Sequence, residues 1–181
     1  MLEKSILNKF MALNLSAVFI GDRMRLAKIM ENDVVDCDNG FCVSVWVSGC
    51  PHHCVGCHNQ DLWDRNYGEE RPWMEVAAMA ERALKKNRIE RNLSILGGEP
   101  LADYNYLEVG YLINYIKKHY QKTKIYLWTG YTLEELPQEK KEILKNVDVL
   151  IDGRFELDKR DITLKLRGSS NQRILYKGKD F

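Results

Sequence analysis

Residues 47–59 read Val47-Ser48-Gly49-Cys50-Pro51-His52-His53-Cys54-Val55-Gly56-Cys57-His58-Asn59. This stretch gathers three of the chain's five cysteines into one short loop, with three and then two residues between them. Three thiolates so close in sequence can wrap one inorganic centre without help from distant parts of the chain. The loop therefore predicts a metal centre, and the open question is which one.

Zinc and an iron–sulfur cluster both remain possible on this spacing. A structural zinc site is usually closed by four ligands in two separated pairs, whereas here one triplet stands alone. His52, His53 or His58 can supply a fourth ligand, so the loop by itself leaves zinc open. A cubane cluster held by three cysteines instead leaves one iron free to bind a substrate or cofactor. A disulfide fits less well, because the cysteines are clustered and odd in number.

A second informative stretch is Gly97-Gly98-Glu99-Pro100, which directly follows a predicted buried strand at residues 93–96. The two glycines remove side chains where the backbone leaves the strand, so a ligand can lie directly against main-chain N–H and C=O groups. Glu99 adds a carboxylate beside that bare backbone. A carboxylate at this place is suited to an ammonium group.

Taken together, the two stretches resemble the signature of the radical S-adenosylmethionine (SAM) enzymes, a cysteine triplet followed by a Gly-Gly-Glu turn after a later strand. Within that family the chain is similar to the activases of anaerobic ribonucleoside-triphosphate reductases. The similarity runs from about Met24 to the C-terminal region. It rests on Ser48 to Asn59, Trp63, Gly97 to Leu101, Trp128-Thr129-Gly130-Tyr131, Asp152-Gly153-Arg154-Phe155 and Arg167 to Arg173.

The resemblance implies two cofactors. Cys50, Cys54 and Cys57 would bind three irons of a [4Fe-4S] cluster, and SAM would chelate the fourth iron. An electron from the cluster would then cleave SAM and produce a 5′-deoxyadenosyl radical. In such chemistry the protein holds, tunes and shields the cofactors. We therefore expect no side chain of the chain to act as a catalytic acid, base or nucleophile.

The resemblance also assigns contacts to SAM, position by position. The expected contacts are Gly97, Gly98 and Glu99 at the methionyl end, the backbone of Gly56, Cys57 and His58 near the adenine, and Thr129 and Asp152 at the ribose or methionine. Many radical SAM proteins carry an aromatic residue just before the last cysteine, but this chain and the activase group have glycine there. Gly56 therefore favours the activases over the wider family.

The implied substrate is a glycine Cα–H on the large glycyl-radical subunit of an anaerobic ribonucleotide reductase, with flavodoxin or ferredoxin as an example of the electron donor. Rivals within the family are a pyruvate formate-lyase type activase and a 7-carboxy-7-deazaguanine synthase. Residues 128–131 and 167–173 favour the reductase activase over both. A non-catalytic zinc-binding module is the rival from another class, and it leaves the Gly-Gly-Glu turn unexplained.

Length and composition set the outer bounds. With 181 residues, one domain is expected. A net charge of +1 gives no argument for nucleic acid or a membrane surface, and no apolar run is long enough to span a bilayer. The odd, clustered cysteines indicate a reducing compartment, so we expect a cytoplasmic protein. Residues 1–23 are interpreted as an upstream extension, with Met24 as a candidate start and residues 24–181 as a single radical SAM domain.

The hydrophobic pattern predicts strands that alternate with helices. The predicted strands are 26–30, 43–47, 93–96, 125–128 and 147–151, and the predicted helices run from Pro72 through Leu84, from Tyr104 to Tyr120 and from Thr132 to Lys145. Thr132 and Glu135 form a candidate capping box for the third helix. Cys37 and Cys42, outside the triplet, are interpreted as small buried hydrophobic residues.

Small residues follow four of the predicted strands, at Ser48-Gly49, Gly97-Gly98, Thr129-Gly130 and Asp152-Gly153. The carboxyl ends of parallel strands meet at one rim of the sheet, where βα folds usually place their sites. The cysteine loop and the Gly-Gly-Glu turn are therefore expected to be neighbours. A full eight-fold barrel takes about 250 residues. The chain is shorter, so we expect an α/β fold of radical SAM type, an incomplete (β/α) barrel with an open side.

Overall fold

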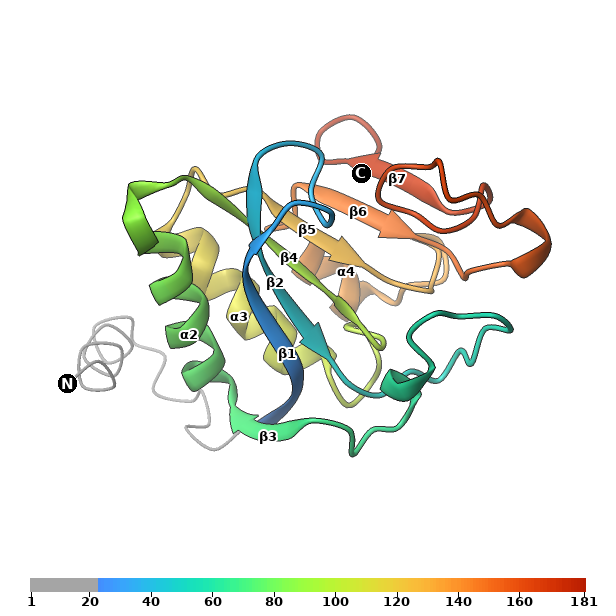
Figure 1. Cartoon of the computed structure of the whole chain (residues 1–181), viewed down its shortest axis with the longest axis horizontal. Coiled ribbons are helices and arrows are strands. Elements are labelled where there is room, and N and C mark those ends of the chain that lie inside the picture. The colour runs from blue at the N-terminus through green and yellow to red at the C-terminus, as the bar shows by residue number, and fades with distance from the viewer. Residues whose placement is uncertain (1–22) are drawn as a thin grey trace.

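The computed structural model describes residues 23–181, which form a mixed α/β fold on one open seven-stranded sheet (Figure 1). The expected extension over residues 1–23 lies outside this part of the chain, apart from Arg23. The sheet order is β3-β1-β2-β4-β5-β6-β7. The strands are β1 (Arg23–Asp33), β2 (Phe41–Val47), β3 (Glu69–Pro72), β4 (Arg91–Gly97), β5 (Ile125–Trp128), β6 (Val149–Asp152) and β7 (Arg173–Tyr176).

The centre of the sheet is parallel, as the alternation of strands and helices predicts. Strands β2, β4, β5 and β6 run in the same direction, with Val47 opposite Gly97 and Trp128 opposite Ile151. The edges of the sheet are antiparallel. Strand β1 pairs antiparallel with both β2 and β3, and β7 pairs antiparallel with β6. The carboxyl ends of the four parallel strands therefore lie along one rim, where the site is built.

Three α-helices cover one face of the sheet (Figure 1). They are α2 (Trp73–Lys85), α3 (Tyr106–His119) and α4 (Gln138–Leu144). The main core lies between these helices and the sheet, where alternate strand residues such as Val45, Ile95 and Leu127 are fully buried. Removing this much apolar surface from water is the dominant stabilising contribution to such a fold.

Within residues 23–181 the opposite face of the sheet carries no α-helix, and connecting segments cover it instead (Figure 1). Trp46 and Leu96 form a small apolar cluster on this face, against which Trp128 packs. Trp128 Nε1–H donates a 2.8 Å hydrogen bond to the carbonyl of Leu166, which lies in the segment between β6 and β7. This part of the face therefore forms the floor of a pocket.

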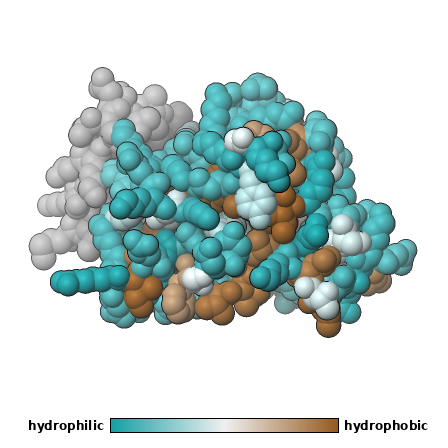
Figure 2. Space-filling view, turned by 90° about the horizontal axis from the view of Figure 1, so that it is seen from above, coloured by the Kyte–Doolittle hydropathy of each residue, from teal (hydrophilic) through white to brown (hydrophobic). Residues whose placement is uncertain are grey.

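The loop between β1 and β2 stands at the top of Figure 1 and exposes the apolar side chains of Val34 and Val35. Seen from that side, the surface is mostly hydrophilic, with hydrophobic residues from the middle of the view down to its lower edge (Figure 2). Cys37 in this loop and Cys42 on β2 are buried in a cluster with Tyr126. Their interpretation as small buried hydrophobic residues is confirmed.

The helix predicted from Thr132 to Lys145 was wrong at its start. Thr132 N–H does donate to Glu135 Oε2 at 2.8 Å, which is the hydrogen bond expected in a capping box. However, α4 begins only at Gln138, after Pro137. Proline fixes φ and lacks an N–H, so it fits just before or at the first helical position and not inside a helix. The short edge strands β3 and β7 were also not predicted.

No helix in residues 23–181 combines the length and the apolar character that crossing a bilayer requires.

Candidate metal and cofactor site

The cysteine loop follows β2 and the Gly-Gly-Glu turn follows β4, and the two backbones touch. Gly98 N–H donates to the carbonyl of Val47 at 2.8 Å, and Glu99 N–H donates to the carbonyl of Gly49 at 2.7 Å. A Cβ on Gly98 would lie 2.5 Å from that Gly49 oxygen, closer than atoms can approach. Only glycine at position 98 therefore allows the loop and the turn to pack together. The two stretches are neighbours, as the sequence predicted, but the space beside Gly98 is filled by the cysteine loop rather than left free for a ligand.

All three thiols of the triplet line one pocket of about 330 Å³, together with Gly97 and Gly98. The three cysteines are free and half-buried. Burial raises the pKa of the Cys50 thiol to about 11 and also raises that of Cys54. Binding of a metal centre must therefore displace protons from these sulfurs. Within residues 23–181, no three His, Cys, Asp or Glu side chains lie together as ligands of a single metal ion.

Three residues that line the pocket also carry buried N–H groups that lack a partner within residues 23–181. They are Nε1 of Trp46, Nε1 of Trp63 and Nε of Arg167, and all three residues line the pocket. Buried donors are normally hydrogen-bonded, so orphaned ones point to a missing ligand or water. Three sulfur donors beside unpaired N–H donors suit a group that combines metal atoms with hydrogen-bond acceptors. A sulfur-bridged iron cluster with a polar cofactor beside it fits this description.

Glu99 lies at the centre of a dense hydrogen-bond network. Its Oε1 accepts from Leu101 N–H at 2.9 Å and from the Thr129 hydroxyl at 2.8 Å. Its Oε2 accepts from Gly130 N–H at 2.7 Å and pairs with His52 Nε2 at 2.9 Å. The side chain of Glu99 is 1% exposed. The turn after β4, the turn after β5 and the cysteine loop therefore all meet at one carboxylate.

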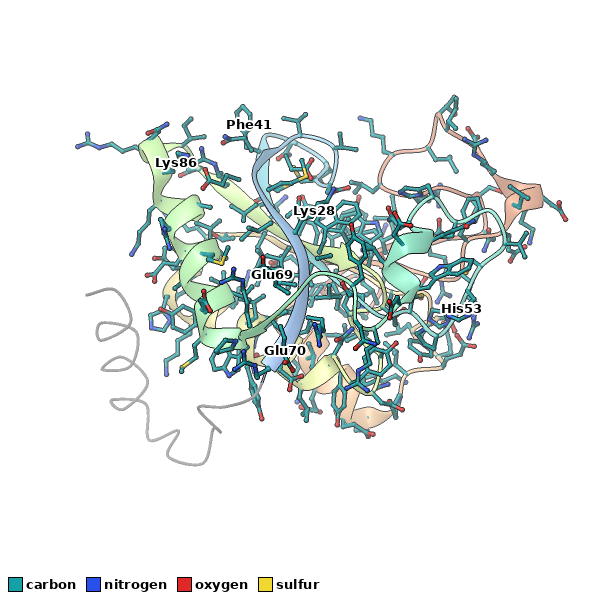
Figure 3. All side chains as sticks on the ribbon, turned by 60° about the horizontal axis from the view of Figure 1, so that its bottom comes forward. Lys28, Phe41, His53, Glu69, Glu70 and Lys86 are labelled. Carbon is teal, nitrogen blue, oxygen red and sulfur yellow. The ribbon has the colours of Figure 1, made fainter. Side chains whose placement is uncertain are left out.

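The two adjacent histidines of the cysteine loop, His52 and His53, lie in different surroundings, although both were expected from the sequence to lie beside solvent. His53 is exposed and stacks on Trp63, on the cysteine loop at the right of Figure 3. His52 was wrongly placed, because its side chain is only 6% exposed and bonds to Glu99. No local pattern predicts a pairing between residues 47 positions apart.

Thr129 and Asp152, the two other residues at strand ends, line different pockets. Thr129 is buried and lines the same pocket as the thiols. Asp152 is also buried, but it lines a neighbouring pocket of about 520 Å³, which shares His52 and Cys54 with the first. There it accepts from Leu133 N–H at 2.7 Å and from Arg173 Nε at 2.8 Å. Asp152 therefore ties β7 to the rim of the sheet.

The remaining expected contacts belong to the tip of the cysteine loop. Gly56 has a φ of +76° and packs so closely on Leu157 that a Cβ would lie 2.8 Å from that side chain. Cys57 Sγ accepts a hydrogen bond from Asn59 N–H at 3.4 Å. His58 is exposed at the pocket mouth, which it helps to line.

Comparison with known proteins agrees with this geometry. The model of a family described as a 4Fe-4S single cluster domain matches residues 38–175. Three relatives are each named anaerobic ribonucleoside-triphosphate reductase-activating protein. The one from Vibrio cholerae is 40% identical over 143 residues, covering 78% of this chain and 91% of its own length. That from Pasteurella multocida is 37% identical over 158 residues (85% and 98%), and that from Enterobacteria phage T4 is 40% identical over 136 residues (75% and 83%).

The fold, the three thiols and the matching family model define a single-cluster iron–sulfur protein. Within that class, identity of 35–40% over most of the chain narrows the assignment. The chain belongs to the family of anaerobic ribonucleoside-triphosphate reductase-activating proteins.

Proposed function

We propose that this protein is an activating enzyme that reductively cleaves SAM at a [4Fe-4S] cluster and generates a glycyl radical on an anaerobic ribonucleoside-triphosphate reductase. One observation carries the proposal. The cysteine triplet and the Gly-Gly-Glu turn line a single pocket and are joined by main-chain hydrogen bonds. A cluster bound by three cysteines has one iron to offer, and the turn lies where a cofactor can reach that iron.

In this proposal Cys50, Cys54 and Cys57 hold the cluster, which supplies the electron that cleaves SAM when both are bound. The turn at residues 97–99 faces the methionyl end of SAM. The backbone of Gly56, Cys57 and His58 lies near the adenine, and Thr129 and Asp152 contribute to the ribose or methionine side. The three unpaired N–H donors of the pocket support this use, because SAM carries carboxylate, hydroxyl and ring-nitrogen acceptors.

The open sheet supports a fold of radical SAM type, an incomplete (β/α) barrel whose helix-free face receives the substrate. The free thiols fit a reducing compartment, so we propose the cytoplasm as the location. The proposed partners are the large glycyl-radical subunit of the reductase and an electron donor such as flavodoxin or ferredoxin. No nucleic acid or membrane enters the proposal.

The test is formation of the radical on the partner. Anaerobically reconstituted and reduced protein is incubated with SAM and the large subunit of an anaerobic ribonucleotide reductase, and the mixture is examined by electron paramagnetic resonance (EPR). A glycyl-radical signal and release of 5′-deoxyadenosine are expected. Pyruvate formate-lyase as the acceptor is the control for the nearest rival. Stoichiometric zinc without iron after anaerobic purification would defeat the proposal.

A further inference from the structure

The side chain of His52 joins the two halves of the candidate site. His52 stands between the first two cysteines of the triplet, and Glu99 is the last residue of the Gly-Gly-Glu turn. The 2.9 Å contact between His52 Nε2 and Glu99 Oε2 lies in a place that solvent scarcely reaches, with the side chains 6% and 1% exposed. We call this pair the His52–Glu99 latch.

The imidazole of the latch is held from other sides as well. It meets the ring of Tyr131 edge-on, with ring centroids 4.5 Å apart and an interplanar angle of 72°. It also packs directly on Gly130, where a Cβ would lie 2.3 Å from the His52 ring. Such packing fixes the ring orientation, so the hydrogen bond to Glu99 costs little further conformational entropy.

The carboxylate of the latch has no acceptor position left. A carboxylate offers about four lone-pair positions. Leu101, Thr129, Gly130 and His52 each direct one donor at Glu99, two to each oxygen. An additional donor, such as the ammonium group of SAM, would have to displace one of these buried donors and leave it unpaired, at a cost of about 1–3 kcal/mol.

We propose that the His52–Glu99 latch positions the SAM-binding turn against the cluster loop, and that the Glu99 side chain is a positioning group rather than the ligand of the SAM ammonium group. This inference rests on the proposed function and deepens it. SAM must reach the turn and the cluster at the same time, so their separation decides how well it binds. A displacement of about 1 Å in such a constellation can cost on the order of 100-fold in rate.

The experiment compares four substitutions at two adjacent histidines in the anaerobically reconstituted protein. H52F and H52N remove the donor or place it out of reach, whereas H52Q returns an N–H donor at a similar distance. H53Q is the matched control, because His53 is exposed and is not one of the four hydrogen-bond partners of the Glu99 carboxylate. The readouts are iron content, the SAM dissociation constant by equilibrium dialysis, and the EPR spectrum of the reduced cluster with and without SAM.

We expect H52F and H52N to keep the iron content of the wild type, because all three thiols remain. Their SAM dissociation constant should rise by about tenfold, and the change that SAM makes in the EPR spectrum should be lost at SAM concentrations that saturate the wild type. H52Q should stay within about threefold of the wild type, and H53Q should match it. If H52F does not fold, which thermal unfolding will show, the comparison of H52N with H52Q carries the same test.

Three outcomes would overturn the inference. H52F and H52N that bind SAM like the wild type would show that the latch does not position the turn. Loss of iron in parallel with SAM binding would show a structural role only. H52Q as defective as H52F would show that the hydrogen bond is not what matters. Failure of the wild type itself to bind SAM would instead overturn the proposed function, so the two failures are distinguishable.

Discussion

At the scale of single residues, the five cysteines divide into two kinds that the sequence already separated. Cys50, Cys54 and Cys57 line the pocket, while Cys37 and Cys42 are buried among apolar side chains. Spacing reveals the first group because three ligands in eight residues serve one centre whatever the rest of the fold does. The environment of His52 was not predictable, because it depends on which turn a later strand brings to the loop.

Replacing a cysteine of the triplet should remove the metal centre. We expect Cys54→Ala to assemble no stable [4Fe-4S] cluster and to lose SAM cleavage by at least 100-fold, since two thiolates cannot hold the cubane in place. Iron analysis and visible absorption after anaerobic reconstitution measure the first effect, and release of 5′-deoxyadenosine measures the second. Cys37→Ala is the control and should keep its iron. Retained SAM cleavage in Cys54→Ala would contradict the ligand assignment.

Asp36 should make stability depend on pH. Burial, followed by a hydrogen bond with Asp33, raises the pKa of Asp36 from 3.8 to about 7. The folded state therefore binds this proton more tightly than the unfolded state, and the resulting stabilisation is complete below about pH 4 and is lost as the pH rises through 7.

The substitution Asp36→Asn removes this titration. We expect the variant to have a higher melting temperature than the wild type at pH 8, with the difference shrinking toward pH 5. Thermal unfolding of both proteins across that range measures it. A difference that does not change with pH would show that Asp36 has an ordinary pKa.

At the scale of elements, the strand ends were predictable and the helix and sheet boundaries were less so. Short apolar runs place β2, β4, β5 and β6, and the glycines after them mark the rim. The edge strands β3 and β7 are four residues each and carry charged residues, so they are too short for a hydrophobic pattern to predict them. Their pairing is decided by the tertiary fold, because β1 and β6 would otherwise expose an edge.

The contact between the cysteine loop and the turn after β4 should not tolerate a side chain at position 98. In Gly98→Ala the new Cβ meets the carbonyl oxygens of Gly49 and Leu62, which are backbone atoms that cannot rotate away. We expect the loop to shift, with loss of about 1–3 kcal/mol of stability and of measurable SAM binding. Thermal unfolding and equilibrium dialysis provide the measurements.

The control for this substitution is Gly178→Ala. Gly178 has a φ of +78°, but a Cβ there meets nothing within 4 Å. It reports the cost of backbone strain without a collision, and its SAM binding should be that of the wild type. A Gly98→Ala protein that behaves like Gly178→Ala would show that the two segments do not need their close approach.

At the scale of the whole molecule, the sequence indicated an α/β fold with one site at one rim, and the open sheet agrees with that. The expected substrate came from the family resemblance alone. Neither the spacing nor the burial of residues shows whether the substrate is a glycine on a partner protein or some other molecule. The antiparallel edges were not predicted. They matter for the site, because Arg173 on β7 pairs with the buried Asp152 at the end of β6.

Because the five sulfurs are unequally buried, alkylation of the cysteines can measure how much of the protein carries a cluster. A small alkylating reagent applied to the folded, metal-free chain should modify the three loop thiols first, because Cys37 and Cys42 are 6% and 0% exposed. After reconstitution those same three sites should be protected. Intact-mass spectrometry would then give the fraction of chains whose three loop thiols are protected, without relying on visible absorption or enzyme activity.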